Sequence, residues 1–421
     1  MKIKKSVLAE TLKVLGRVVS QTSPEAVLRS IRFIGNGNRV WLSATDGVEI
    51  VAQEVDAESE GMVDFAVEYK ALRELIRGTR GREVEVVGEK MEWPAVAVPP
   101  AEAKQIPLPE NFGKLLAEAA QIVNRQEARL PLRGIHLCPD GIVVTDGKQL
   151  LHLPVAWTLD APFTLPFPLA LLTARPEGAG TLMVWELNGT TVFQIEIGSF
   201  VWIGRALPGA YPSWKQVIPE PSALNYAITF TPEQSVKLAE FLKTVPDHPP
   251  FHAIELNVVP SGIEVIPADF PEMIIKLKTE VSGTRPREVL ALNKLILSRM
   301  LQQGYTTFRA NSEGGLPAVA TGGSGSFLAM PVRIFAQPKP NKEVKTMEPI
   351  KQIETKEEPI NPLDELNHGI DELRGKLKLL FDESAVLTRK LKEVALEQKQ
   401  KEREFVQARR AIERIRAASG F

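Results

Sequence analysis

The triplet Thr-Asp-Gly occurs at two places in this chain, Thr45–Gly47 and Thr145–Gly147, one hundred positions apart. Each copy follows a short apolar run and precedes another, and a turn sequence, Gly35–Asn38 or Pro139–Gly141, stands before the first run. Two hairpin connections in the same order predict a duplicated β-rich unit. A weaker third copy spans Ile254–Phe270, so we expect three related units, each as large as a small domain.

Amphipathic segments flank each set of hairpins. Apolar residues recur at helical spacing over six segments: Val7–Val19, Tyr69–Arg77, Phe112–Val123, Pro168–Ala174, Val236–Val245 and Asn293–Gln303. Thr231 as N-cap, Pro232 and Gln234 form a capping-box start signal, and Gly304 is expected to end the last helix. The pattern predicts an α+β fold of three repeated domains, each with two helices on antiparallel sheet, at residues 1–106, 107–220 and 221–335.

Length and composition fit this organisation. A chain of 421 residues is too long for one core and suits three domains and a tail. No apolar run approaches the roughly 18 residues of a membrane span, and Met1–Lys5 lacks the apolar core of a signal peptide. We therefore expect a cytoplasmic protein without membrane partners. Cys138 has no partner for an intrachain disulfide and is expected to be a buried strand residue.

The charge is unevenly distributed along the chain. Residues 336–421 hold 18 Lys and Arg and 16 Asp and Glu, which leaves 33 and 36 for the first 335 residues. Cations nevertheless recur in or beside the expected helices, at Lys13, Arg17, Arg73, Arg77, Arg80, Arg82, Lys114, Arg125, Arg129, Lys237, Lys243, Lys294 and Arg299. A mildly acidic body with cationic helices would hold a polyanion on one surface. The alternative is that these are ordinary solvated helix faces.

Three sequence motifs resemble the bacterial sliding clamp family, the beta subunit of DNA polymerase III. Thr145–Leu150 is similar to the signature of that family's second domain, Gly209–Pro219 to the segment that closes this domain, and Phe327–Ile334 to the family's C-terminus. The motifs occur in the family's order and spacing on a threefold repeat. The resemblance covers about residues 1–334.

The resemblance implies a ring formed by a head-to-tail homodimer, with three clamp domains per subunit and helices around a central hole. Such a ring holds double-stranded DNA by topology, through weak phosphate contacts that do not depend on base sequence. Arg77, Arg125, Gln126 and Arg129 match family positions near the duplex. At 165–168, where many members are basic, this chain reads Leu-Pro-Phe-Pro. A noncatalytic processivity factor without cofactors is therefore expected.

The resemblance also implies a cleft between the second and third domains that binds short peptide motifs of DNA polymerase, the clamp loader and repair proteins. The matching positions are Leu132, Thr145, Gly147, Lys148, Gln149, Leu150, Pro212, Gln216, Val217, Leu328, Ala329, Met330, Pro331 and Val332. Apolar walls with a flexible Met suit several peptides. Lys148, Gln149 and Gln216 replace His, Arg and Arg of the family, so partner preference is expected to differ. The alternative for Leu132, Leu150 and Val217 is core packing.

Catalytic and metal sites are not favoured by the sequence. Asp46, Asp146 and Asp269 belong to separate repeats and are more simply turn residues that make local hydrogen bonds. The prolines between His248 and His252 prevent the helix that would align two zinc ligands. Gly322–Gly325 lacks the following Lys-Ser or Lys-Thr of a phosphate loop. We therefore expect neither a metal nor an enzymatic activity.

The tail departs from the family pattern. Residues 336–360 are rich in Pro, Lys and Glu and predict a solvated linker. From Leu363 to Ile415 sixteen sites follow a strict 3,4 spacing, and all but Ser384, Gln398 and Lys401 are apolar, which predicts a coiled coil over 361–421. Pairing of two tails in the dimer is one arrangement, docking of a single amphipathic helix on the ring is another, and binding to a helix of a different protein is a third. A clamp-derived scaffold in which the coiled coil carries the function is the alternative to a replicative clamp.

Overall fold

A computed structural model of the chain describes residues 1–94, 99–101, 103–247 and 252–333. These described residues form one compact unit. The expected linker, the expected coiled coil and His248 lie outside the described residues. Among the described residues, no helix is both long enough and apolar enough to cross a membrane.

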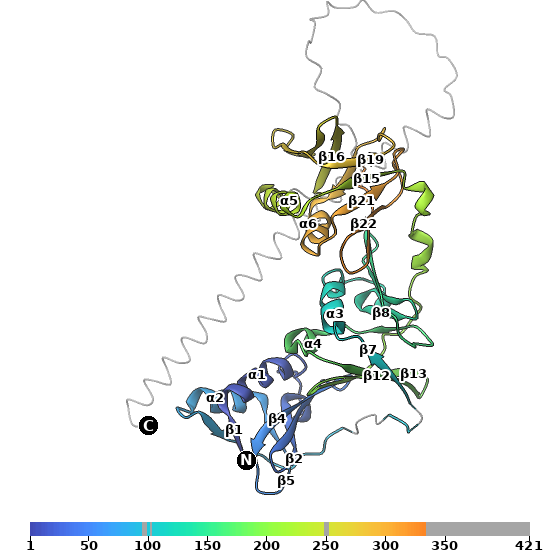
Figure 1. The fold of residues 1–421 in the computed structure, drawn as a ribbon. Helices are drawn as coiled ribbons and strands as arrows, with labels where there is room; N and C mark the ends of the chain where they lie inside the picture. The colour runs from blue at the N-terminus through green and yellow to red at the C-terminus, as the bar shows by residue number, and fades with distance from the viewer. Residues whose placement is uncertain (95–98, 102, 248–251, 334–421) are drawn as a thin grey trace, which may run out of the picture. The chain divides into compact units, whose positions relative to one another are not determined.

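The described part of the chain contains helices and antiparallel sheets, which confirms the expected α+β class (Figure 1). Its α-helices are α1 (Lys5–Leu15), α2 (Tyr69–Gly78), α3 (Phe112–Ala120), α4 (Leu169–Ala174), α5 (Pro232–Thr244) and α6 (Lys294–Gln302). Short 3-10 helices occur at η1 (Val27–Arg29), η2 (Leu130–Arg133), η3 (Trp214–Val217) and η4 (Pro221–Ala223).

The strands of the described residues form three sheets. The 10-stranded sheet runs β5 (Met62–Glu68), β2 (Ser30–Asn36), β3 (Arg39–Thr45), β4 (Ile50–Glu58), β14 (Phe200–Arg205), β13 (Thr190–Ile197), β12 (Gly180–Leu187), β7 (Lys104–Leu108), with β1 (Lys2–Lys4) paired to β4 and to β6 (Glu83–Glu85). The 9-stranded sheet runs β11 (Phe163–Leu165), β8 (Ile135–Cys138), β9 (Gly141–Thr145), β10 (Gln149–Pro154), β23 (Ser326–Ala329), β22 (Ala318–Thr321), β21 (Thr307–Ala310), β15 (Tyr226–Thr229), β19 (Glu280–Gly283). The 4-stranded sheet runs β18 (Ile275–Leu277), β17 (Gly262–Pro267), β16 (Ala253–Val259), β20 (Leu290–Asn293).

The threefold repeat is visible in the strand order. β2-β3-β4, β8-β9-β10 and β16-β17-β18 are three antiparallel meanders, each preceded by one helix and followed, after a further strand or two, by another. The predicted boundary between residues 106 and 107 falls inside β7. Because β7 pairs with β12, this strand belongs with the second repeat.

Successive repeats are joined by continuous β-pairing. β4 of the first repeat pairs with β14 of the second, and β10 of the second pairs with β23 of the third. At the second junction Leu151 lies opposite Phe327, and both side chains are fully buried. Burying an apolar side chain of this size contributes about 1.5–3 kcal/mol. The junctions are therefore extensions of the core.

The helices form a row of neighbours. Helix α1 packs against α2 and α4, α3 packs against α4, and α5 packs against α6 (Figure 1). Tyr305, just after α6, donates a hydrogen bond to Glu118 of α3, and the Gln303 side chain donates to the Glu118 carbonyl. The contacts therefore run from α2 through α1 and α4 to α3, then through the residues just after α6 to the pair α6 and α5.

Local signals fix the helix ends. The Thr231 hydroxyl accepts from the Gln234 N–H and the Gln234 side chain accepts from the Thr231 N–H, which confirms the capping box. Helix α1 ends at Leu15, four residues before its expected end. A Cβ on the following residue, Gly16, would lie 2.3 Å from the Tyr69 hydroxyl, so a larger residue there would have to displace the Tyr69 side chain of α2.

Candidate functional site

The Thr145–Leu150 turn is built by local hydrogen bonds. Asp146 Oδ1 accepts from the N–H groups of Lys148 and Gln149, while Thr145 Oγ1 accepts from the Gly147 N–H and donates to the Gln149 carbonyl. Gly147 has φ 84°, a conformation that favours glycine. The turn places Lys148 on the surface and Gln149 and Leu150 inside.

The same bonds occur in the first repeat. Asp46 Oδ1 accepts from the N–H groups of Val48 and Glu49, and Thr45 Oγ1 bonds to the Gly47 N–H and the Glu49 carbonyl. The expectation that Asp46 and Asp146 are turn residues is confirmed. Asp269 also lies at a turn, between β17 and β18. No group of three or more metal-ligating side chains occurs within the described ranges.

A groove opens beside the second turn, with a volume of about 150 Å³. Its lining residues come from the second and third repeats: Arg129, Leu132, Thr145, Gly147, Lys148, Gln149, Leu150, Pro212, Ser213, Trp214, Val217, Pro317, Leu328 and Met330. A cavity of this volume, lined by apolar side chains, is large enough for a benzene ring. The groove can therefore take one large apolar side chain as an anchor.

A small apolar cluster forms the floor of the groove. Leu150, Trp214 and Leu328 pack with Cys138 and Val143, separately from the main core. Cys138 is buried at the end of β8, as expected. Met330 and Val217 at the rim are 47% and 50% exposed. The groove thus has a rigid apolar floor and adaptable apolar edges.

Aromatic stacking holds the segment that carries Trp214. The Tyr211 ring stacks on His136 of β8 with centroids 4.2 Å apart, and the His152 ring lies 4.9 Å from that of Trp214. Burial lowers the pKa of His136 to about 4. His136 is therefore neutral at pH 7 and acts as an apolar stacking surface.

Most expected cleft positions meet in this groove. Gln216, Ala329, Pro331 and Val332 do not line it, and Ala329 is buried in β23. Leu132 and Leu150 are buried as core residues are, yet they still line the groove. Arg129, Ser213, Trp214 and Pro317 were not expected there. Trp214 lay within the Gly209–Pro219 motif and could have been identified from it, whereas no sequence signal singled out Pro317.

Cations stand at one side of the groove. Arg129 Nε lies 3.2 Å from Glu127 Oε1, and this hydrogen bond holds the pKa of the Glu127 carboxyl below its usual range. Lys148 is exposed on the turn. Arg129 was expected at DNA through the resemblance, but the structure places it at the groove. An apolar groove with cations beside it suits a peptide with an apolar anchor and an acidic group.

Most of the other expected DNA-contacting residues are exposed. These are Lys13 and Arg17 of α1 and the turn after it, Arg73 and Arg77 of α2, Arg80, Lys114 of α3, Arg125 and Gln126 after α3, and Lys237 of α5. The Arg125 guanidinium lies 5.0 Å from the centroid of the Phe167 ring, in the segment where the chain lacks basic residues. This cation–π contact orients Arg125.

Lys294 was expected to contact DNA, but the structure buries it. Its side chain is buried and donates to the Val245 carbonyl at 3.0 Å and to Asp247. Both partners lie just beyond the end of α5, so the ammonium is enclosed by α5 and α6. A lysine held in this way has a structural role and cannot contact DNA.

Arg299 also differs from expectation, because it points across the junction between repeats. It is partly buried, and its Nη1 donates to Gln149 Oε1 at 2.7 Å. In this conformation the Arg299 guanidinium bonds to a residue of the groove, so the DNA contact expected from the sequence stays a prediction.

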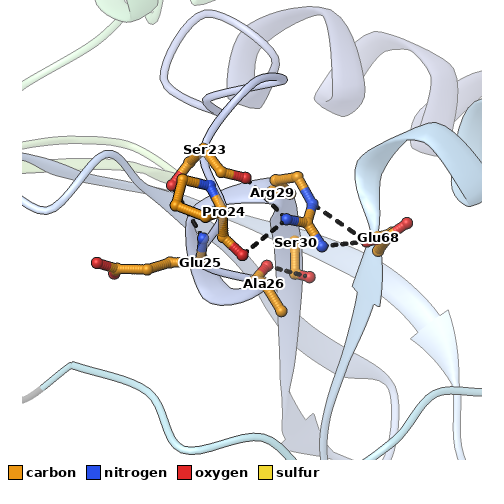
Figure 2. A network of polar contacts seen from close by, with 7 residues as sticks. All are labelled: Ser23, Pro24, Glu25, Ala26, Arg29, Ser30 and Glu68. Carbon is orange, nitrogen blue, oxygen red and sulfur yellow. Dashed lines mark hydrogen bonds and ion pairs between the residues drawn. The ribbon is translucent and has the colours of Figure 1, made fainter.

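A cavity of about 380 Å³ lies beside the cationic helix α2, lined by Val19, Gln21, Arg29, Glu68, Tyr69, Lys70, Arg73, Glu74 and Arg77. Figure 2 shows the polar contacts of Arg29, one of these lining residues. The guanidinium donates to the carbonyls of Ser23 and Pro24 at 2.7 and 3.0 Å and to the Glu68 carboxylate at 2.9 Å. Ser30 Oγ donates to the Ala26 carbonyl. These bonds fix the loop after α1 against the start of α2.

No protein-family model and no curated protein matches this chain. Solved bacterial sliding clamps do match it. A Pseudomonas aeruginosa clamp with a ligand has TM-score 0.64 and 17% identity, over 79% of this chain and 99% of that one. A Bartonella birtlesii clamp bound to griselimycin has TM-score 0.64 and 16% identity, and a Caulobacter crescentus clamp 0.62 and 17%, with the same coverage. The chain therefore has the sliding-clamp fold.

Proposed function

We propose that this chain is a noncatalytic DNA sliding clamp that encircles duplex DNA in the cytoplasm and tethers a replicative polymerase. The observation that carries the proposal is a row of neighbouring helices with exposed cations, on the sliding-clamp fold. Cations on several helices would neutralise phosphates without reading bases. Contacts of this kind permit sliding, and a closed ring would supply retention.

The groove would receive peptides of the polymerase, the clamp loader and repair proteins. Its floor accepts one large apolar side chain, and Arg129 and Lys148 would attract an acidic neighbour. Clamps of Bartonella birtlesii and Pseudomonas aeruginosa were solved with griselimycin bound. Griselimycin is therefore a suitable first probe of this groove.

Ring closure by a head-to-tail homodimer is supported by two open strand edges. β4 and β10 each pair with the next repeat, whereas β18, their counterpart in the third repeat, pairs only with β17 in the described part of the chain. At the other end β6 pairs with β1 and with no other strand of the described residues. With buried faces aligned, Lys276 of β18 would lie opposite Glu83 or Glu85 of β6 in a second copy. Opposite charges at such positions favour pairing.

One observation favours the second candidate, a clamp-derived scaffold. The second and third repeats each have two strands, β13-β14 and β22-β23, beyond the strand that follows their second helix. Among the described residues between β6 and β7, no such strands follow β6, and Glu89 bridges instead to Ala66 of β5. The first repeat would therefore offer a smaller surface for ring closure.

Retention on DNA decides between these candidates. The full chain is loaded onto nicked circular plasmid, and bound protein is measured by gel filtration as salt is raised. A clamp stays on the circle at salt concentrations that remove it from the same plasmid after linearisation. Equal loss from circular and linear plasmid would contradict encirclement and favour the scaffold.

A further inference from the structure

We propose that Arg299 is a positioning residue for the groove, holding the Asp146–Gln149 turn in place from helix α6. The inference rests on the proposed function of the groove as a peptide site. It assigns to Arg299 a role in peptide binding in place of the DNA contact expected from the sequence.

A chain of hydrogen bonds leads from α6 to the groove. Arg299 Nη1 donates to Gln149 Oε1 at 2.7 Å, and Gln149 Nε2 donates to Asp146 Oδ2 at 2.6 Å. Asp146 Oδ1 accepts from the N–H groups of Lys148 and Gln149 at 2.9 and 3.0 Å. The Lys148 carbonyl accepts from the Met330 N–H at 2.9 Å. Two groove residues, Lys148 and Met330, therefore stand at the far end of this chain of bonds.

Burial makes the first bond costly to lose. The Gln149 side chain is 6% exposed, and its amide uses Arg299 on the oxygen side and Asp146 on the nitrogen side. Without Arg299 the amide oxygen would lack this donor inside the protein, and leaving a buried polar group unpaired is unfavourable. The amide would then turn toward another donor and pull on Asp146.

The first repeat shows that the turn itself does not need the arginine. Its Thr-Asp-Gly turn has the same backbone bonds, but the residue equivalent to Gln149 is Glu49, which accepts from Trp202 Nε1 at 2.7 Å. Substitution of Arg299 should therefore leave the turn and the fold formed. The substitution should instead increase the mobility of the Asp146–Gln149 turn relative to β23 and Met330.

Binding of griselimycin, measured by calorimetry on the full-length protein, tests the inference. Arg299→Ala should weaken binding roughly tenfold, the size expected for losing one hydrogen bond from a charged donor. Arg299→Lys should restore part of the affinity. The double variant Arg299→Ala with Gln149→Ala should bind no more weakly than Gln149→Ala alone, because both act through one bond.

Arg309→Ala is the matched control, since Arg309 is an exposed arginine of the same repeat on β21. It should leave affinity unchanged. Affinity of folded Arg299→Ala within twofold of the unaltered chain would overturn the inference. So would additive effects of Arg299→Ala and Gln149→Ala.

Hydrogen exchange on the ligand-free protein separates this inference from the proposed function. Arg299→Ala should speed exchange at the amides of Lys148, Gln149 and Met330, and Arg309→Ala should not. If the unaltered chain binds no griselimycin but exchange rises at those amides, the peptide function fails while the positioning role holds. Unchanged exchange at all three would overturn the positioning role.

Discussion

Polar residues at equivalent positions of this protein have different hydrogen-bond partners and different burial, even where their local sequences match. Glu49 and Gln149 occupy equivalent positions in two identical turns, yet one meets an indole and the other a guanidinium. Burial raises the pKa of Glu49 to about 7, against the lowering effect of the Trp202 hydrogen bond. Lys294 and Lys237 are both helical lysines of the third repeat, and only Lys237 is exposed.

Glu49 should make stability depend on pH. Because its pKa in the folded protein lies above the ordinary value of 4.5, protonation of Glu49 favours folding, and this contribution is lost as pH rises from about 4.5 through about 7. The loss is at most about 3 kcal/mol. Urea midpoints of the unaltered chain should fall between pH 5 and pH 8 relative to those of Glu49→Gln. Parallel midpoints across that range would show that Glu49 is not protonated when folded.

Substitution of Lys294 should lower stability, whereas substitution of Lys237 should affect DNA retention. Lys294→Ala leaves the Val245 carbonyl and Asp247 without their donor and should cost about 1–3 kcal/mol of unfolding free energy. Lys237→Ala should leave stability within about 0.5 kcal/mol and lower the salt dependence of DNA retention. Thermal unfolding measures the stability of each variant, and salt titration of plasmid-bound protein measures its retention on DNA. A stable Lys294→Ala variant with weakened DNA retention would reverse the assignment.

At the scale of elements, turns and helix caps that depend on residues close in sequence could be predicted. Contacts between segments distant in sequence could not. The Asp146 turn and the Thr231 cap are local, so their sequence patterns were sufficient. The sequence could not show that the end of α5 would enclose Lys294, or that Pro317 would reach the groove. The sequence also could not show that the described residues between β6 and β7 would form no further strands, because the repeat pattern predicted further strands in every unit.

The groove should be sensitive to charge at its edge. Met330→Asp places a carboxylate over the apolar floor formed by Leu150, Trp214 and Leu328, and leaving a charge there without a partner is unfavourable. Griselimycin binding should fall at least about 100-fold, near 3 kcal/mol. The mass of the protein in sedimentation should not change, since the side chain is already half-exposed. Undiminished binding would place the peptide site elsewhere.

At the scale of the whole molecule, the three repeats are joined by sheets that continue from one to the next, and the proposed ring extends that rule to a second copy. β18 and β6 are the edges left for this purpose among the described residues. The predicted coiled coil, which lies outside the described residues, would add a second means of association. Deleting residues 336–421 should raise the dimer dissociation constant measured by sedimentation if two tails pair, and leave it unchanged if each tail docks on its own ring.

The central claim, a closed ring around DNA, can be tested by locking the two open edges with cysteines. A full-length variant with Glu85→Cys and Lys276→Cys, or Glu83→Cys and Lys276→Cys, is loaded on nicked circular plasmid and oxidised; Cys138 is buried and should not interfere. We expect a doubly cross-linked dimer that stays with the circle in SDS and is released by a single double-strand cut. Cross-linked dimers that separate from circular plasmid in SDS as readily as from linear plasmid would contradict it.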